Sequence, residues 1–252
     1  MPVPYDLFNY NSYWQFRKYE DQSERIALER FFQNIGKKDT LADIGGGFGR
    51  LVPVYLPFVK KVTLCDPSEK LLEIAKEKFK TNSQISYQKG GFPNLLFPDS
   101  CFETVLLIRV IHHLEDPKIA FEEVFRILKP GGFFFLEFAN KIHFLARIKA
   151  FFKRDFSFAS NLSPFEQRSK ESIRKRKILF LNHHPKKIIS DLRECGFLVE
   201  ESLSVSNFRN PIIKEIFPLK ILLFFEKVCQ KPLSSLFFGP SIFLLCYKPH
   251  KT

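Results

Sequence analysis

The residues best suited to chemistry are an aspartate and a group of glycines in the stretch LADIGGGFGR, residues 41–50. An apolar run that contains Asp43 ends there and is followed by Gly45, Gly46, Gly47 and Gly49. Glycine lets a chain turn sharply and lets a ligand approach the backbone amides. We therefore predict that a ligand binds against the main chain of this turn.

A second acid indicates the kind of ligand. Asp66 ends the next apolar run, 23 residues after Asp43, where a carboxylate can accept both hydroxyls of a ribose. The glycine spacing is GxGxG, with Arg50 where the GxGxxG pattern of dinucleotide-binding proteins has glycine or alanine. The Lys-Ser/Thr pair of a Walker-type phosphate loop is also missing from this turn. The pattern predicts a nucleoside-containing cofactor and disfavours a dehydrogenase.

Alternating strands and helices must position these residues. Short apolar runs predict strands at 40–44, 61–65, 84–88, 104–108 and 132–138, and amphipathic runs predict helices at 19–35, 68–80 and 116–128. Further along, the pattern predicts a helix that Gly196 ends, strands at 198–206 and 241–247, and between them an amphipathic helix pair broken at Pro218. Such alternation is typical of right-handed βαβ units around a parallel sheet.

The motifs together resemble the class I S-adenosylmethionine-dependent methyltransferases, and within them the ubiquinone/menaquinone methyltransferase-like branch. They are LADIGGGFGR, LCDPSEKLLEIAKEK, FPDSCFETVLLIRVIHHLEDPKIAFEEVFRILKPGGFFFLEF and LRECGF, and they cover about half of the chain. The resemblance implies a Rossmann-like three-layer α/β sandwich, with a seven-stranded, mostly parallel sheet, an antiparallel last strand and an inserted helical cap. We expect one domain over 1–252, with an N-terminal helical segment at 1–36, a basic, Phe-rich cap at 141–182 and a second helical cap at 207–235.

The resemblance also assigns roles to single residues. Asp43 and the backbone of Gly45, Gly46 and Gly47 would hold the methionine end of S-adenosylmethionine, Asp66 would hold the ribose, and Arg109 would border the sulfonium. The family usually has an acid that binds the adenine amino group, and Gly91 stands at that position. Adenine recognition would then depend on packing by Phe92 and on backbone contacts.

The sequence does not decide which residue is the general base that takes a proton from the acceptor. Histidine suits that role at neutral pH, and the catalytic candidates are His112 and His113 in VIHHLED and His184 in NHHPKK. The alternative for the first pair is a structural cap or core contact, and for His183 and His184 a loop that begins a helix. Glu137, inside a predicted strand, is a further candidate. No metal is expected, because a sulfonium carries its own electrophile and leaving group.

The cap at 141–182 carries much of the chain's positive charge. The whole chain has a formal net charge of +12, and this segment holds eleven Lys or Arg against three acids. Phenylalanines are interleaved with these charges. The segment is either a solvated cover over the site or a surface for an anionic bilayer or a lipid-like acceptor. The run RKRK at 174–177 could contact phosphates, but the chain lacks a nucleic-acid recognition module, so we consider nucleic acid unlikely.

The composition and the hydropathy pattern narrow the classes of protein that the sequence fits. The five cysteines form no CxxC pair and predict neither a zinc site nor a disulfide framework. No apolar run has the length of a signal peptide or a membrane span, so we expect a cytoplasmic protein, with a peripheral membrane position left open. The predicted function is methyl transfer to a small-molecule or lipid-like acceptor. The alternatives are a non-catalytic S-adenosylmethionine-binding or interaction protein and a methyltransferase acting on RNA.

Overall fold

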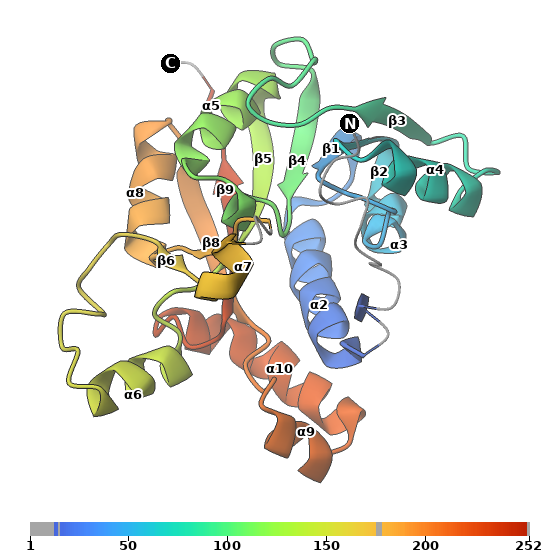
Figure 1. The fold of residues 1–252 in the computed structure, drawn as a ribbon. Helices are drawn as coiled ribbons and strands as arrows, with labels where there is room; N and C mark the ends of the chain where they lie inside the picture. The colour runs from blue at the N-terminus through green and yellow to red at the C-terminus, as the bar shows by residue number, and fades with distance from the viewer. Residues whose placement is uncertain (1–12, 15, 175–177, 251–252) are drawn as a thin grey trace.

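Seven strands form one twisted sheet in the computed structural model, which describes residues 13–14, 16–174 and 178–250 (Figure 1). The spatial order is β3-β2-β1-β4-β5-β9-β8. The strand bounds are β1 (Lys38–Ile44), β2 (Val59–Asp66), β3 (Ile85–Lys89), β4 (Phe102–Leu107), β5 (Leu128–Ala139), β8 (Leu198–Val205) and β9 (Ser241–Tyr247).

The pairing confirms the predicted sheet. Strands β1 to β5 are parallel, and β9 is antiparallel to both of its neighbours, β5 and β8. The last strand in the sequence is therefore the reversed one and lies inside the sheet instead of at its edge. Strand β5 begins four residues before its predicted start, because Leu128 pairs with Phe102 across a register shift.

Helices cover both faces of the sheet. One core includes side chains from α2 (Lys18–Ile35), α3 (Val52–Tyr55) and α4 (Glu69–Lys78), and the other includes α5 (Pro117–Ile127) and α8 (Pro185–Glu194). Ser68 caps α4 by accepting a hydrogen bond from the Leu71 amide, and Asp116 caps α5 in the same way through Lys118. The three-layer arrangement agrees with the prediction.

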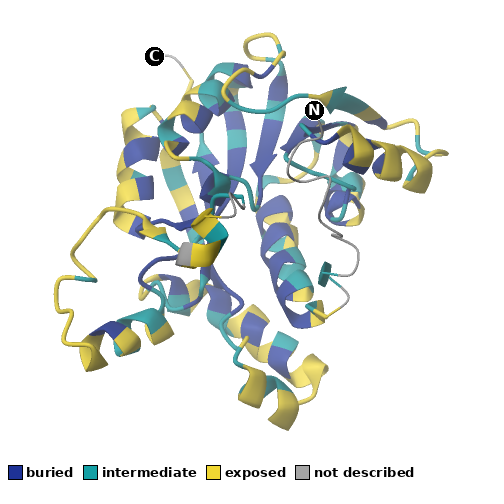
Figure 2. Ribbon diagram, viewed as in Figure 1, coloured by how far each residue is buried: buried dark blue, intermediate teal, exposed yellow. Residues whose placement is uncertain are grey.

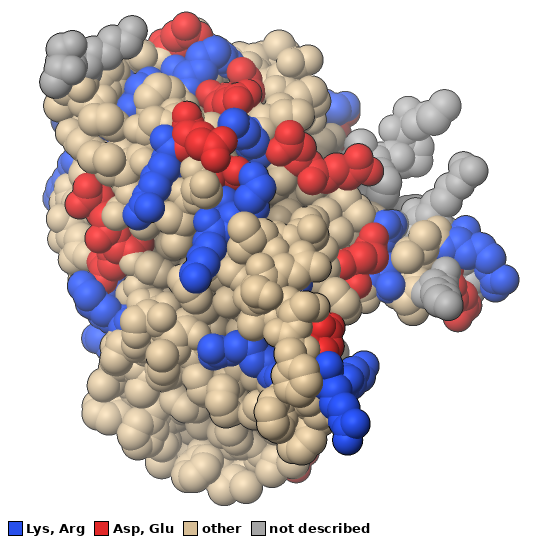
Figure 3. All heavy atoms as spheres, turned by 90° about the vertical axis from the view of Figure 1, so that its left-hand side faces the viewer, with Lys and Arg blue, Asp and Glu red and all other residues tan. Residues whose placement is uncertain are grey.

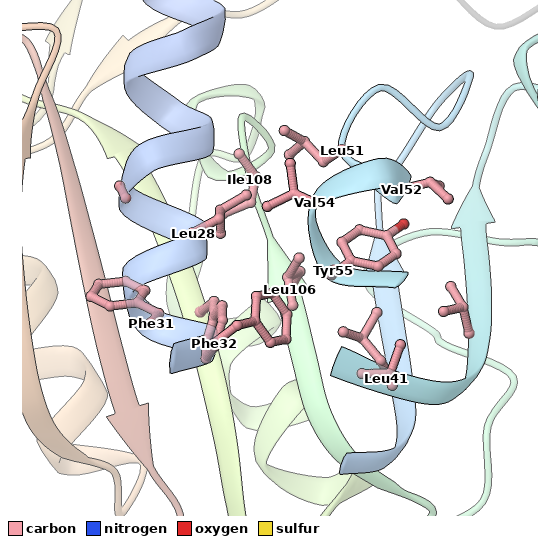
Figure 4. Close-up of a cluster of buried hydrophobic side chains, with 14 of the residues drawn as sticks. Leu28, Phe31, Phe32, Leu41, Leu51, Val52, Val54, Tyr55, Leu106 and Ile108 are labelled. Atoms are coloured by element: carbon pink, nitrogen blue, oxygen red, sulfur yellow. The ribbon is translucent and has the colours of Figure 1, made fainter. Parts of the chain in front are cut away.

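Aromatic packing anchors α2 to the sheet (Figure 4). Phe31 and Phe32 are fully buried, and the centroids of their rings lie 5.3 Å and 4.8 Å from the centroid of Phe135 in β5. Contacts of this size typically stabilise a fold by about 3–5 kcal/mol per aromatic side chain, as judged by truncation to alanine. This packing fixes the C-terminal half of α2 against β5.

The connections after β5 and β8 carry the other elements. The first holds α6 (Phe144–Phe152), α7 (Lys170–Arg174) and a small hairpin of β6 (Phe165–Glu166) and β7 (Leu181–Asn182). Residues 175–177 of the RKRK run lie outside the described residues, as do residues 1–12. The second holds α9 (Pro211–Ile216) and α10 (Leu219–Ser234), and the predicted break at Pro218 separates them. That these connections act as caps stays a prediction.

Candidate active site

The turn after β1 has the backbone that its glycines predict. Gly45 and Gly47 have φ values of +77° and +54°, which side chains rarely adopt. At Gly46 an added Cβ would lie 2.4 Å from Leu64 Cδ1 and 2.8 Å from the Asp43 carboxylate. The amides of Gly45 and Gly46 both donate to the Cys65 carbonyl, at 2.7 and 3.2 Å, which ties the turn to the end of β2. The turn is thus a bare, fixed stretch of backbone.

Asp66 is held in place by the same turn. Its Oδ2 accepts a hydrogen bond from the Gly47 amide at 2.9 Å, and its Oδ1 accepts one from the Ser68 amide at 2.8 Å. A carboxylate oxygen has two lone pairs and can therefore accept more than one hydrogen bond. The side chain is therefore oriented before any ligand arrives.

Asp43 is a buried acid at the base of the turn. The Tyr55 hydroxyl donates to its Oδ2 at 2.9 Å. Burial raises the pKa of Asp43 to about 6, although the Tyr55 hydrogen bond opposes the shift. The carboxyl group thus titrates near neutral pH, unlike an exposed aspartate.

A cavity of about 140 Å³ opens beside the turn. It includes the predicted Asp43, Asp66, Arg109 and His113. The complete lining is Trp14, Asp43, Gly45, Gly46, Gly47, Phe48, Arg50, Leu51, Asp66, Pro67, Leu71, Ile108, Arg109, Val110 and His113. Bare backbone on one side, an oriented carboxylate on another and apolar walls are features that can hold an adenosyl group.

A cluster of charged residues forms another wall of the cavity, and sequence reasoning did not predict it. Glu24, in the buried stripe of α2, is fully buried and lies 2.5 Å from a guanidinium nitrogen of both Arg50 and Arg109. Trp14 covers both arginines, with its ring centroid 3.8 Å from Arg50 Cζ and 4.9 Å from Arg109 Cζ. Burial alone would raise the pKa of Glu24, but the two guanidinium groups lower it, so the carboxylate is charged.

Arg109, which we predicted to border the sulfonium, lies in the cavity wall in an unusual conformation. Its φ is +61°, and its amide donates to Glu137 Oε2 at 2.8 Å. The other Glu137 oxygen accepts a short hydrogen bond from Ser241. Burial raises the pKa of Glu137. Because one oxygen accepts from the Arg109 amide and the other is held by the Ser241 hydroxyl, we assign Glu137 to holding Arg109 in place.

The two residues predicted for adenine lie outside the cavity lining. An added Cβ on Gly91 would lie 3.6 Å from the ring of Pro67, which does line the cavity, so Gly91 is close to its rim. Phe92 packs against the core on the α5 face of the sheet. Their role in adenine binding stays a prediction.

The predicted base candidates have different environments. His113 lines the cavity, and its Nδ1 lies 2.6 Å from the Leu179 carbonyl. A carbonyl only accepts, so Nδ1 carries the proton and Nε2 has the lone pair. Burial lowers the pKa of His113 and of the adjacent His112, whose ring meets that of His113 edge to face, and this keeps both rings neutral at pH 7.

The other histidine candidate has a structural role in the described fold. His184 caps α8: its Nδ1 accepts from the Lys186 amide, and its Nε2 lies 3.0 Å from the Ala159 carbonyl. Both nitrogens are therefore engaged, and His184 does not line the cavity. Of the three predicted bases, the geometry brings only His113 to the cavity lining.

Comparison with known proteins shows what the chain is similar to. Residues 42–136 match the family model described as a methyltransferase domain, and this range contains the glycine turn, Asp66 and Arg109. This chain is thus similar to methyltransferase domains over residues 42–136. It is also 32% identical to a demethylmenaquinone methyltransferase of Leptospira interrogans over 135 residues, which cover 52% of this chain and 53% of that protein. The chain spans about half or less of the length of the curated relatives it matches.

Solved structures with the same fold as this chain were also found. A candidate S-adenosylmethionine-dependent methyltransferase from Listeria monocytogenes superposes with a TM-score of 0.64 at 16% identity, covering 91% of this chain and 98% of that one. The [4+2]-cyclase SpnF superposes with a TM-score of 0.61 at 15% identity, covering 90% of this chain and 82% of that one. At such identities the likeness establishes only the fold. S-adenosylmethionine is the cofactor of the family.

Proposed function

We propose that the protein transfers a methyl group from S-adenosylmethionine to a small-molecule or lipid-like acceptor. The observation that carries the proposal is the turn after β1, where Gly45 to Gly47 leave the backbone bare and the Gly47 amide orients the Asp66 carboxylate. This arrangement supports binding of an adenosyl group with its ribose at Asp66. A non-catalytic cofactor-binding protein and a methyltransferase acting on RNA are the alternatives, and the experiments below distinguish them from the proposal.

When bound, S-adenosylmethionine supplies the methyl group together with its own leaving group. The chain needs to orient the acceptor and exclude water, and orientation alone can lower a barrier by about 7–11 kcal/mol. Asp66 and the glycine turn would hold the ribose and the methionine end, while Leu71 and Ile108 contribute apolar lining that excludes water. Trp14 and the Glu24 cluster would keep the opposite wall fixed.

His113 is the proposed general base for an acceptor that must lose a proton. It lines the cavity, burial keeps it neutral, and its Nε2 has the lone pair. Methylation at oxygen or carbon would need such a group, whereas an amine acceptor that is already neutral would not. The dependence of activity on His113 therefore reports the kind of atom that is methylated.

A lipid-like acceptor is favoured by two lines of support. The apolar residues of the cavity outnumber its charged ones, and the related Leptospira protein is named for demethylmenaquinone, a prenylated quinone. The identity of 32% extends over half of each chain, so it supports the acceptor class and no particular compound.

Turnover tests the proposal. We expect S-adenosylmethionine with an isotopically labelled methyl group to label a compound in an organic extract of cells, and Asp66→Asn to reduce labelling at least tenfold. Asp99→Asn, a change at an exposed carboxylate, should leave the rate unchanged. Cofactor binding without labelling of any metabolite or RNA would support the non-catalytic alternative. Labelling of RNA alone would support a methyltransferase that acts on RNA.

A further inference from the structure

Helix α10 is amphipathic in the opposite sense to a normal surface helix. Its buried side includes Glu226, Gln230 and Ser234, and its exposed side carries the four apolar residues Ile221, Phe224, Phe225 and Val228. These four are spaced i, i+3, i+4 and i+7, so they lie on one face. Phe224 is 65% exposed and Val228 is 58% exposed. A surface helix of a water-soluble domain normally turns such a face inward.

Hydrogen bonds explain why the polar face is the buried one. Glu226 accepts from the Tyr19 hydroxyl at 2.6 Å and from the amides of Ser206 and Asn207 at 2.8 and 3.0 Å. Gln230 donates to the Ser23 carbonyl at 2.9 Å. The orientation of α10 is thus set by polar contacts to α2 and to the end of β8, and the apolar face points away from the domain.

The apolar face continues onto neighbouring elements. Phe144, at the start of α6, stacks on Phe238 with a centroid distance of 4.8 Å, and Arg147 donates to the Leu236 carbonyl at 3.0 Å. Helix α6 therefore lies against the segment that follows α10. We call the combined region the apolar end surface. It consists of the exposed side chains of Phe151, Phe152, Ile212, Ile216, Ile221, Phe224, Phe225, Val228 and Leu236.

This surface lies at one end of the molecule. Helices α6, α9 and α10 are grouped at the lower end in Figures 1 and 2, where their exposed residues face outward, beyond the carboxyl ends of the parallel strands. More than half of the exposed large apolar side chains among the described residues belong to α6, the loop after it, α9, α10 and Leu236. An exposed apolar region of this extent indicates an interaction site.

The charges around the apolar end surface decide which partner fits. From Pro211 to Ser234 there are four lysines, and the acids are Glu215 and the buried Glu226. Lys149, Lys153 and Arg154 are exposed on or next to α6, with Asp155 as the neighbouring acid. The lower part of the face drawn in Figure 3 is mainly uncharged, with mostly Lys and Arg among its charged groups.

A second copy of the chain fits this surface poorly. A twofold contact pairs the same patch with itself, so the lysines of both copies would meet, and each copy has a formal net charge of +12. An anionic lipid surface complements the same features, because phenylalanines enter the boundary of headgroups and acyl chains while lysines face the negative headgroups. None of the described helices is long and apolar enough to cross a bilayer, which leaves a position in the interface plane.

We propose that the apolar end surface binds anionic lipid bilayers. Phe224 and Phe225 on α10 would enter the boundary of headgroups and acyl chains. Lys220 and Lys227 on the same helix would face the negative headgroups. Because α10 packs on α2, which carries Glu24, the bilayer would lie at the end of the molecule where the cavity is found. An acceptor dissolved in the bilayer would then lie close to the site, although bilayer binding itself does not depend on methyl transfer.

Vesicle sedimentation with the full chain tests this proposal. We expect the protein to sediment with phosphatidylcholine vesicles that contain phosphatidylglycerol at low salt, and to do so less at high salt. Phosphatidylcholine vesicles alone should bind it more weakly. Absence of binding to anionic vesicles at both salt concentrations would overturn the proposal.

Variants distinguish binding through the apolar end surface from non-specific hydrophobic binding. The double change Phe224→Glu/Phe225→Glu should lower binding to anionic vesicles at least tenfold, and Lys220→Gln/Lys227→Gln should lower it about fivefold per lysine. A matched control, Leu96→Glu/Leu198→Glu, alters exposed apolar residues elsewhere and should bind like the wild type. Unchanged thermal melting would verify the fold of each variant, and wild-type binding by all of them would contradict the proposal.

Two further measurements make the interpretation specific. Asp66→Asn should sediment with vesicles like the wild type, so loss of the cofactor site and loss of the bilayer site are distinguishable. Sedimentation velocity reports self-association. If the wild type were a dimer that Phe224→Glu/Phe225→Glu dissociates, and neither bound vesicles, the surface would be a contact between copies and the bilayer proposal would be wrong.

Discussion

The cavity wall and the apolar end surface depart from the usual distribution of residues in opposite ways. In the wall, Glu24 is buried and held between Arg50 and Arg109. On the end surface, phenylalanines are exposed on a helix whose buried side is polar. Buried charges remain only where partners compensate the loss of water, whereas exposed apolar groups gain from a non-aqueous partner. The buried charges keep the cavity in shape, and the exposed phenylalanines present a surface for binding.

Among the variants of the cavity wall, the largest effect is expected from Glu24→Ala, which leaves two guanidinium groups beside the cavity without their shared carboxylate. Removing one member of a buried ion pair typically costs about 3–5 kcal/mol, and we expect about 3 kcal/mol because Asp21 still pairs with Arg50. Chemical denaturation measures this change in the free energy of unfolding. Glu29→Ala, at an exposed position of the same helix, should change it by less than about 0.5 kcal/mol. Equal effects of both variants would mean that the cluster does not hold the wall.

Asp43 should make stability fall as the pH rises. The pKa of Asp43 is about 6 in the folded protein, whereas that of an unperturbed aspartate is 3.8. The folded state therefore binds the proton more tightly than the unfolded state. Stability from this group is complete below about pH 4 and is lost as the pH rises through 6. The loss is about 3 kcal/mol at most. The difference in unfolding free energy between wild type and Asp43→Asn isolates this group, and a difference that is constant from pH 4 to pH 7 would exclude the raised pKa.

Tyr19→Phe tests the polar face that orients α10. The change removes the hydroxyl that donates to Glu226 and accepts from the Phe208 amide, and leaves both of these groups with one partner fewer. We expect a loss of about 2 kcal/mol in the free energy of unfolding. Tyr87→Phe, which removes a 3.3 Å hydrogen bond to the Ala75 carbonyl, is the matched control and should cost about 1 kcal/mol or less. If Tyr19→Phe were neutral, polar contacts would not explain why α10 faces outward with its apolar side.

The smallest effect is expected from Phe224→Ser. Because this side chain is largely exposed, the free energy of unfolding should change by less than about 0.5 kcal/mol. Phe31→Ala, in the fully buried core, should cost about 3–5 kcal/mol in the same denaturation experiment. A loss above about 1.5 kcal/mol for Phe224→Ser would indicate that the folded chain covers this face, which contradicts an open apolar end surface.

Local patterns predict the sheet and the glycine turn well. Strand periodicity, Gly45 to Gly47 and the acid at Asp66 are all readable within a few neighbouring residues, and the described strands confirm the sheet. The Glu24 cluster was not predicted, because Trp14, Glu24, Arg50 and Arg109 meet only in the folded chain. One signal was present: Glu24 lies four residues before Leu28 and seven before Phe31, on the apolar stripe of its helix.

The orientation of α10 could not be predicted for a different reason. Its stripe of Ile221, Phe224, Phe225 and Val228 predicts an amphipathic helix, but periodicity does not say which face packs on the domain. The decisive contacts join Glu226 to Tyr19, which is 207 residues away in the sequence. The role of His184 is similarly non-local, since its Nε2 contacts a carbonyl 25 residues earlier in the chain.

Calorimetric titration with S-adenosylmethionine and with its demethylated product tests the central claim most directly. The account predicts one binding site for each ligand, and at least tenfold weaker binding in Asp66→Asn, with Asp99→Asn unchanged. If neither ligand bound the wild type at millimolar concentration, the glycine turn and Asp66 would not form a cofactor site and the proposed methyl transfer would be contradicted.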